Sequence, residues 1–193
     1  MTAHFSAENR SRAEALVALY PKPRSALVPL CHLAQSQDGW LSAEAMEEIA
    51  ELCGVTPAEV YGTATFYDML HCERVGRHVI AICTNVACLL AGAYELVAYA
   101  ERRLGIRCGQ TTGDGEFTLE EAECLAGCDG PPCVQVNHRF VKARDPASFD
   151  ALIAGLRRGE YEGEIPRHGT LCRVERAVAL PGAATPRTRR SGG

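Results

Sequence analysis

Five closely spaced cysteines constrain this chain more than any other feature. The stretches 82–91 and 123–134 read ICTNVACLLA and ECLAGCDGPPCV. The first contains a C-x4-C pair and the second contains a C-x3-C pair followed by one further cysteine. Neither contains the C-x-x-C spacing of a redox-active dithiol or of a common zinc knuckle. The five residues are Cys83, Cys88, Cys124, Cys128 and Cys133.

The composition indicates a cytoplasmic protein whose cysteines are not paired in disulfides. The apolar runs of the 193 residues are far shorter than the roughly 18 to 20 residues that cross a bilayer, and the N-terminus lacks a secretory apolar core. In a reducing compartment, clustered cysteines are metal ligands or catalytic thiols, and isolated ones are mostly small buried hydrophobes. We assign the second role to Cys31, Cys53, Cys72, Cys108 and Cys172.

The periodicity of apolar residues predicts a helical domain in the first part of the chain, residues 1–74. Apolar residues recur at helical spacing in four segments between residues 8 and 70, and Thr56-Pro57-Ala58-Glu59 has the pattern of a helix-starting capping box. Two of these helices could suggest a DNA-reading helix-turn-helix. From Leu41 to Leu70, however, the sequence holds six acidic residues and no Lys or Arg, so we expect no nucleic-acid partner.

Residues 75–160 are expected to form an α/β domain of thioredoxin-like type, followed by an extended tail over 161–193. The pattern predicts a strand at 78–83, one helix over 88–105, a strand at 106–112, extended segments with a turn at Asn137-His138, and a closing helix over 146–159. The tail is rich in Gly, Pro and Arg, and its end is expected to be disordered.

Three chemistries could use two cysteine pairs. Structural zinc accepts four thiolates, but its pairs usually have two residues between ligands and lie closer together than the 35 residues between Cys88 and Cys124. A thioredoxin-like dithiol requires C-x-x-C. A [2Fe–2S] cluster requires four thiolates, two on each iron, and C-x4-C is a known ferredoxin spacing. A Rieske centre is excluded, because no histidine lies beside either pair. We interpret the nearest candidates as surface or strand-end residues, namely His71, His78 and His138.

Three motifs give the chain a resemblance to a known family. They are C-T-N-x-x-C-L-L-x-G over 83–92, T-L-E-E-x-E-C-L-x-x-C over 118–128 and P-x-V-Q-V-N over 132–137. Together with the helical segments YPKPRSALVPLCHLAQSQDGWLS and AEVYGTATFYDML, they resemble the thioredoxin-like [2Fe–2S] ferredoxin family over about residues 10 to 175. The resemblance implies an α/β fold with an N-terminal helical bundle followed by a thioredoxin-like [2Fe–2S] ferredoxin domain.

Carried over position by position, the resemblance implies that the four cluster ligands are Cys83, Cys88, Cys124 and Cys128. The family commonly has Gly then Ala before the last ligand, whereas this chain has Ala126 then Gly127. We expect Gly127 to let this tight loop bend. The residue after the family's proline is usually aliphatic, but here it is Cys133. We interpret Cys133 as a buried substitute for valine; the alternative is a spare thiol that exchanges with Cys128.

The resemblance further implies an electron-transfer subunit without a complete active site of its own. In family members that serve respiratory NADH:quinone oxidoreductase, a flavoprotein partner binds NADH and FMN, and a larger iron–sulfur subunit carries electrons toward quinone. The implied role is one-electron exchange with that flavin, in a complex held peripherally at the inner face of the cell membrane. The alternatives are the equivalent small subunit of an NAD-linked formate dehydrogenase or bidirectional hydrogenase, and a zinc-stabilised interaction module.

The charges near the implied ligands lead us to expect a low reduction potential. Four thiolates, two sulfides and two ferric ions sum to about −2, which becomes about −3 on one-electron reduction. Along the sequence, Glu121, Glu123 and Asp129 lie near the ligands, with no adjacent Lys or Arg. We therefore expect a potential nearer the roughly −400 mV of plant-type ferredoxins than that of a Rieske centre. Backbone N–H groups of residues 85–87 and 125–127 are expected to compensate in part.

Overall fold

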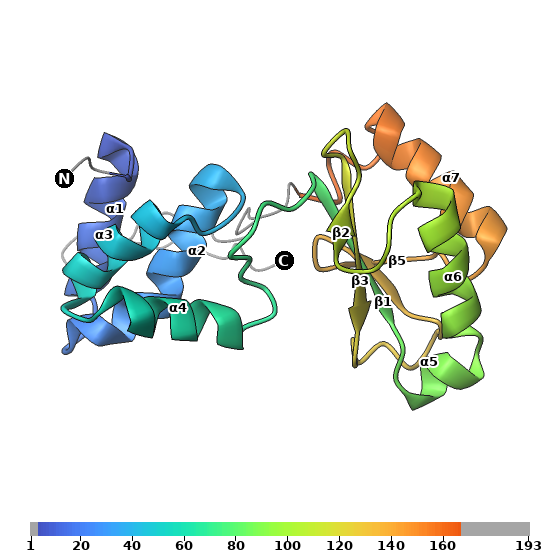
Figure 1. Ribbon diagram of the computed structural model, residues 1–193, viewed down its shortest axis with the longest axis horizontal. Helices are drawn as coiled ribbons and strands as arrows, with labels where there is room; N and C mark the ends of the chain where they lie inside the picture. The colour runs from blue at the N-terminus through green and yellow to red at the C-terminus, as the bar shows by residue number, and fades with distance from the viewer. Residues whose placement is uncertain (1–3, 167–193) are drawn as a thin grey trace, which may run out of the picture.

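The chain folds into two lobes, each built around its own hydrophobic core (Figure 1). The computed structural model describes residues 4–166. The first lobe is helical, and the second combines helices with a five-stranded sheet. This confirms the expected fold class, a helical bundle followed by an α/β domain.

The helical lobe has sharp sequence signals at its helix ends. The α3–α4 junction shows this best, because Gly54 ends α3 in a left-handed conformation and Thr56 forms the expected capping box with Glu59. Leu30, Leu41 and Ile49 are fully buried in the core between the helices. The elements are α1 (Ala7–Ala18), a 3-10 helix (Pro23–Ala26), α2 (Leu27–Asp38), α3 (Ala43–Cys53) and α4 (Pro57–Phe66).

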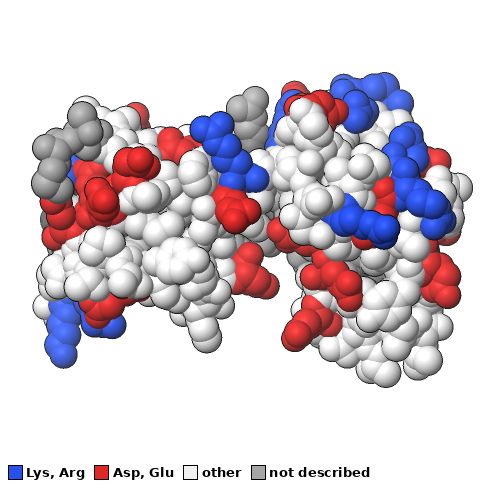
Figure 2. Space-filling model, in the orientation of Figure 1, with Lys and Arg blue, Asp and Glu red and all other residues white. Residues whose placement is uncertain are grey.

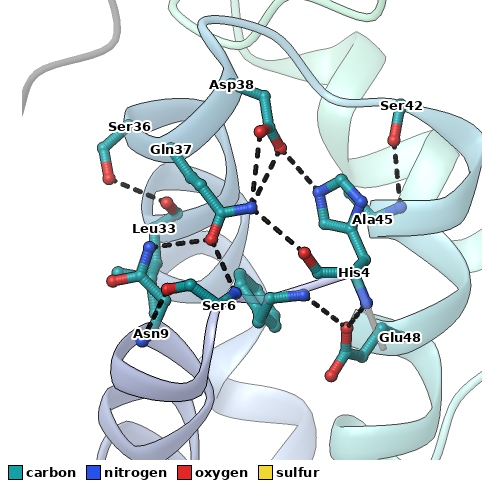
Figure 3. Close-up of polar contacts among 11 residues, drawn as sticks. His4, Ser6, Asn9, Leu33, Ser36, Gln37, Asp38, Ser42, Ala45 and Glu48 are labelled. Atoms are coloured by element: carbon teal, nitrogen blue, oxygen red, sulfur yellow. Dashed lines mark hydrogen bonds and ion pairs between the residues drawn. The ribbon is translucent and has the colours of Figure 1, made fainter. Parts of the chain in front are cut away.

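Polar contacts hold the start of the described chain against α2 and α3 (Figure 3). Glu48 is only 6% exposed and accepts hydrogen bonds from the backbone N–H groups of His4 and Phe5 at 2.6 and 2.8 Å. Its other carboxylate oxygen pairs with Arg10. Burial acts to raise the pKa of Glu48, but the hydrogen bonds from Phe5, Arg10 and His4 lower it below its usual value. This network seats Phe5 in the helical core.

The α/β lobe is a mixed sheet with strand order β2-β3-β1-β4-β5. Strands β1 and β3 are parallel neighbours, and the other neighbouring strands are antiparallel. Helices α6 (Ala93–Leu104) and α7 (Pro146–Arg158) lie side by side on one face of the sheet, where they bury the apolar side chains of the central strands (Figure 1). The strands are β1 (His78–Cys83), β2 (Gln110–Thr111), β3 (Phe117–Ala122), β4 (Val134–Val136) and β5 (Arg139–Val141).

Two expectations for this lobe were wrong in detail. The single helix expected over 88–105 is two helices, α5 (Val86–Leu90) and α6 (Ala93–Leu104), because Gly92 between them adopts φ 88°. The strand expected over 106–112 is only the two residues of β2.

Other expectations for the α/β lobe were confirmed. Asn137 and His138 both have positive φ, 47° and 64°, as a tight hairpin turn between β4 and β5 requires. The closing helix is α7 (Pro146–Arg158).

The remaining expectations concern the C-terminal end of the chain and membrane-spanning segments. The tail expected to be extended over 161–193 instead begins with a turn, in which the N–H of Ile165 donates to the carbonyl oxygen of Tyr161. The end of the tail, expected to be disordered, and Cys172 belong to residues 167–193, which lie outside the described residues. Within residues 4–166, no helix combines the length and the apolar character needed to cross a bilayer.

Candidate metal centre

The two cysteine pairs meet at one edge of the sheet. Because β1 and β3 are parallel and Cys83 is in register with Ala122, the chain leaves both strands at the same end. Cys124 follows β3 after one further residue, and the Cys83 sulfur lies 3.9 Å from the carbonyl oxygen of Glu123. The parallel pairing therefore brings together two stretches that are far apart in the sequence.

The first pair is buried. Cys83 is the last residue of β1 and Cys88 lies within α5, with 3% and 1% of their surfaces exposed. Burial acts to raise the pKa of Cys83, but N–H groups of Asn85 and Leu125, together with the Cys88 thiol, lower it. The backbone donors expected near the sulfurs are thus present at Asn85 and Leu125.

The second pair is exposed. Cys124 and Cys128 both lie on the surface, on the loop that follows β3. The left-handed residue of this loop is Ala126, with φ 56°. Gly127, where the loop was expected to bend, does not have a positive φ, and a Cβ is disfavoured there for a different reason.

That reason is crowding. A Cβ added at Gly127 would lie 2.8 Å from Cε1 of Phe140 and 3.0 Å from the sulfur of Cys133. Gly127 therefore allows the loop to approach the β5 side chain and the buried thiol closely. The reversed order, Ala126 then Gly127, places a Cβ at the left-handed position and removes it from the crowded one.

Cys133 connects the two pairs. Its backbone N–H donates to the Cys88 sulfur at 3.4 Å, and its carbonyl oxygen accepts from the N–H of Cys83 at 3.0 Å. Its thiol donates to the carbonyl oxygen of Gly127 at 2.7 Å. Cys133 is 4% exposed and packs with Cys83 and Cys88. The buried position expected for Cys133 is confirmed.

The donor set fits a two-iron cluster. Within residues 4–166, no three His, Cys, Asp or Glu side chains are grouped closely enough to hold a single metal ion. A [2Fe–2S] cluster takes two thiolates on each iron, and the chain has two cysteine pairs that follow the neighbouring strands β1 and β3. N–H groups already directed at Cys83 and Cys88 suit sulfurs that carry negative charge.

The other cysteines and histidines lie away from this edge or are unsuited to it. Cys31 and Cys53 are buried in the helical core, where burial raises the pKa of Cys31 to about 12. Cys72 and Cys108 are half-buried. His78 begins β1, at the opposite end of the strand from Cys83. His138 is exposed in the hairpin turn, and His71 is a half-buried residue 3.7 Å from Glu120.

The surface around the first pair is apolar. Val86, Leu89 and Leu90 of α5 are exposed, Leu90 by 83%. Figure 2 shows a mostly uncharged surface at the α5 end of this lobe. The sequence pattern alone did not reveal this patch, because these residues read as part of one amphipathic helix.

The structure also brings a cation to the second pair's loop. The guanidinium group of Arg144 lies against Gly130, at the position that a Cβ would occupy. Sequence neighbours of the ligands include no Lys or Arg, so this contact could not be found by reading along the chain.

Comparisons with known proteins match most of the chain. The model of the thioredoxin-like [2Fe-2S] ferredoxin family matches residues 13–157. A subunit of the NADH-quinone oxidoreductase of Rhizobium meliloti is 40% identical over 173 residues, which cover 90% of this chain and 98% of the relative. NADH-quinone oxidoreductase subunit 2 of Thermus thermophilus is 39% identical over 168 residues, covering 86% and 93%.

A solved structure shows the same fold. An NAD+-reducing [NiFe]-hydrogenase in its air-oxidised state matches 73% of this chain with a TM-score of 0.64 and 26% identity, although the match spans only 24% of the hydrogenase chain. The fold, the paired cysteines and the family match together identify the cofactor as one [2Fe–2S] cluster. The chain belongs to the thioredoxin-like [2Fe–2S] ferredoxin family.

Proposed function

We propose that this chain is the electron-transfer subunit in the NADH-oxidising module of an NADH:quinone oxidoreductase. The observation that carries the proposal is the meeting of two cysteine pairs at one sheet edge, beside an exposed apolar helix. Relatives named as subunits of that enzyme, matched over nearly their whole length, support the choice of complex. The cluster ligands in this proposal are Cys83, Cys88, Cys124 and Cys128.

The residues of the site suit reversible transfer of one electron. When bound, the cluster supplies a centre that takes up and returns a single electron. Cys83 and Cys88 would hold it from the buried side, and Cys124 and Cys128 from the exposed side. N–H groups of Asn85, Leu125 and Cys133 point to cysteine sulfurs and stabilise negative charge there. The exposed pair gives electrons a short route to a partner.

We further propose that the apolar surface of α5 docks the partner that exchanges electrons with this site. That partner is a flavoprotein subunit holding FMN and NADH, next to a larger iron–sulfur subunit. Val86, Leu89 and Leu90 offer exposed apolar area beside the ligands, as a buried interface core requires. Attachment to the inner face of the cell membrane would come through the complex.

Copurification tests the assignment to this complex. The full chain, tagged and isolated from its own cells, is expected to bring down a flavoprotein with FMN and a larger iron–sulfur protein, identified by mass spectrometry. The purified chain should then be reduced, desalted and mixed with the isolated flavoprotein in its oxidised state. We expect the chain to be reoxidised by one electron as the flavin absorbance falls. Failure of reoxidation in a preparation with intact iron content would contradict flavin exchange.

A second candidate follows from the hydrogenase likeness. A chain with this geometry could also be the small subunit of an NAD-linked hydrogenase or formate dehydrogenase. The match to an NAD+-reducing [NiFe]-hydrogenase supports this second candidate. The large catalytic subunit that copurifies distinguishes these complexes. A colourless preparation holding one zinc after anaerobic purification would instead indicate the zinc-stabilised module.

A further inference from the structure

One short segment crosses the loop of the exposed cysteines at two glycines. The ring of Phe140 lies against Gly127, with Cε1 2.8 Å from the position that a Cβ would take. The guanidinium group of Arg144 lies where a Cβ of Gly130 would be. A Cβ at Gly127 would crowd the Phe140 ring, and a Cβ at Gly130 would require the end of the Arg144 side chain to move. Both ends of the segment 140–144 therefore lie against the loop that carries Cys128.

The sheet fixes this segment in place. Strand β5 is antiparallel to β4, with Val141 paired to Val134 directly after Cys133. Strand β5 ends at Val141, and the chain continues past the fully buried Ala143 to the exposed Arg144, which lies against the loop. The position of Arg144 thus follows from the register of the hairpin.

Arg144 brings a positive charge that no described carboxylate neutralises. Within residues 4–166, no carboxylate forms an ion pair with Arg144. By contrast, Arg103 of α6 pairs with Asp150, and Arg157 of α7 pairs with Asp114. Gly130 is two residues from Cys128, and two residues span at most about 7 Å between Cα atoms. The guanidinium group therefore lies beside the backbone that holds one of the proposed ligands.

We propose that Arg144 is a charge-compensating residue that raises the reduction potential of this site. It is exposed and contacts no proposed ligand thiol, so it acts through its charge on the loop. One-electron reduction adds a negative charge, and a nearby cation favours the reduced form. This inference rests on the proposed ligand set, and it modifies the expectation that only acidic side chains lie near the cluster.

The test is an EPR-monitored redox titration of the purified full chain. Arg144→Gln is expected to weaken electron uptake about three- to tenfold, which corresponds to a potential lower by about 30 to 60 mV for a one-electron couple. Arg144→Lys keeps the charge, so its electron affinity should differ from that of the native protein by less than about twofold. The difference between native protein and Arg144→Gln should shrink at 1 M salt, because the Debye length there is about 3 Å.

Arg102→Gln is the matched control. Arg102 is an exposed residue in the last turn of α6, at the other end of the lobe from α5 (Figure 1). The same loss of charge there should leave the potential unchanged. If Arg144→Gln does not assemble a cluster, Arg144→Met replaces it, since Met covers Gly130 without charge.

Iron and acid-labile sulfide content separates failure of this inference from failure of the proposed site. Native protein without two iron and two sulfide per chain would overturn the ligand proposal itself. An Arg144→Gln or Arg144→Met protein that holds the cluster at the native potential, or an Arg144→Lys protein that behaves like Arg144→Gln, would overturn the role of the charge. A purely structural role of Arg144 would lower cluster stability and leave the potential unmoved.

Discussion

The loop between Cys124 and Cys128 places alanine where glycine would be unstrained. Ala126 has φ 56°, and the left-handed conformation costs a residue with a Cβ about 1 to 2 kcal/mol. Replacing alanine by glycine also raises the conformational entropy of the unfolded chain, which offsets about 0.4 to 1 kcal/mol of that gain in stability. Ala126→Gly should therefore stabilise the folded loop by about 1 kcal/mol.

Gly127→Ala should have the opposite effect. Its Cβ would lie 2.8 Å from Cε1 of Phe140 and 3.0 Å from the sulfur of Cys133. Overpacking of this kind costs about 1 to 3 kcal/mol. The double variant Ala126→Gly with Gly127→Ala, which has the order common in the family, should fall between the two single variants.

The assay is the rate at which a strong chelator removes iron from the anaerobic full chain, followed by loss of visible absorbance. If iron leaves through opening of this loop, about 1 kcal/mol corresponds to roughly a fivefold change in rate. Ala126→Gly should slow iron release, and Gly127→Ala should accelerate it. Faster release from Ala126→Gly than from native protein would refute the argument from backbone strain.

Two further predictions concern the scaffold. Asn137→Ala removes three side-chain hydrogen bonds, including the one from the N–H of Val79 at 2.8 Å, and should destabilise the α/β lobe by about 3 kcal/mol, measured by thermal unfolding; an unchanged midpoint would contradict it. Glu48→Gln should remove a loss of folding stability that the native protein shows in acid. Because the folded-state pKa of Glu48 is below its ordinary 4.5, its stabilisation is present above that pH and is lost as the pH falls through the folded-state value. Native protein and Glu48→Gln should therefore differ in urea stability at pH 7 and converge in acid, and a constant difference would be evidence against the network.

Features with local signals could be predicted from the sequence. The capping box at Thr56 and Glu59 fixes the start of α4 through contacts within one turn. The turn at Asn137-His138 requires two residues that tolerate positive φ, and the sequence supplies them between two apolar segments. The spacing of the four cysteines proposed as ligands is likewise a local pattern, because each pair follows the end of one strand.

Features that depend on register could not be predicted in this way. Arg144 contacts Gly130 only because β5 pairs with β4 and carries the chain back over the loop. Glycine at position 127 was read as a bend, whereas its role is to leave room for Phe140. The break at Gly92 was missed because the apolar residues keep their helical spacing across it, although the helix itself is interrupted there. In each case the deciding contact is absent from the one-dimensional pattern.

Iron, acid-labile sulfide and the EPR signal of the reduced full chain, measured in five single Cys→Ser variants, test the central claim most directly. Substitution of Cys83, Cys88, Cys124 or Cys128 should damage or abolish the two-iron cluster. Cys133→Ser should retain two iron and two sulfide per chain, because its backbone N–H still reaches the Cys88 sulfur. Loss of the cluster in Cys133→Ser, with retention in Cys128→Ser, would mean that Cys133 is the fourth ligand and would contradict the account.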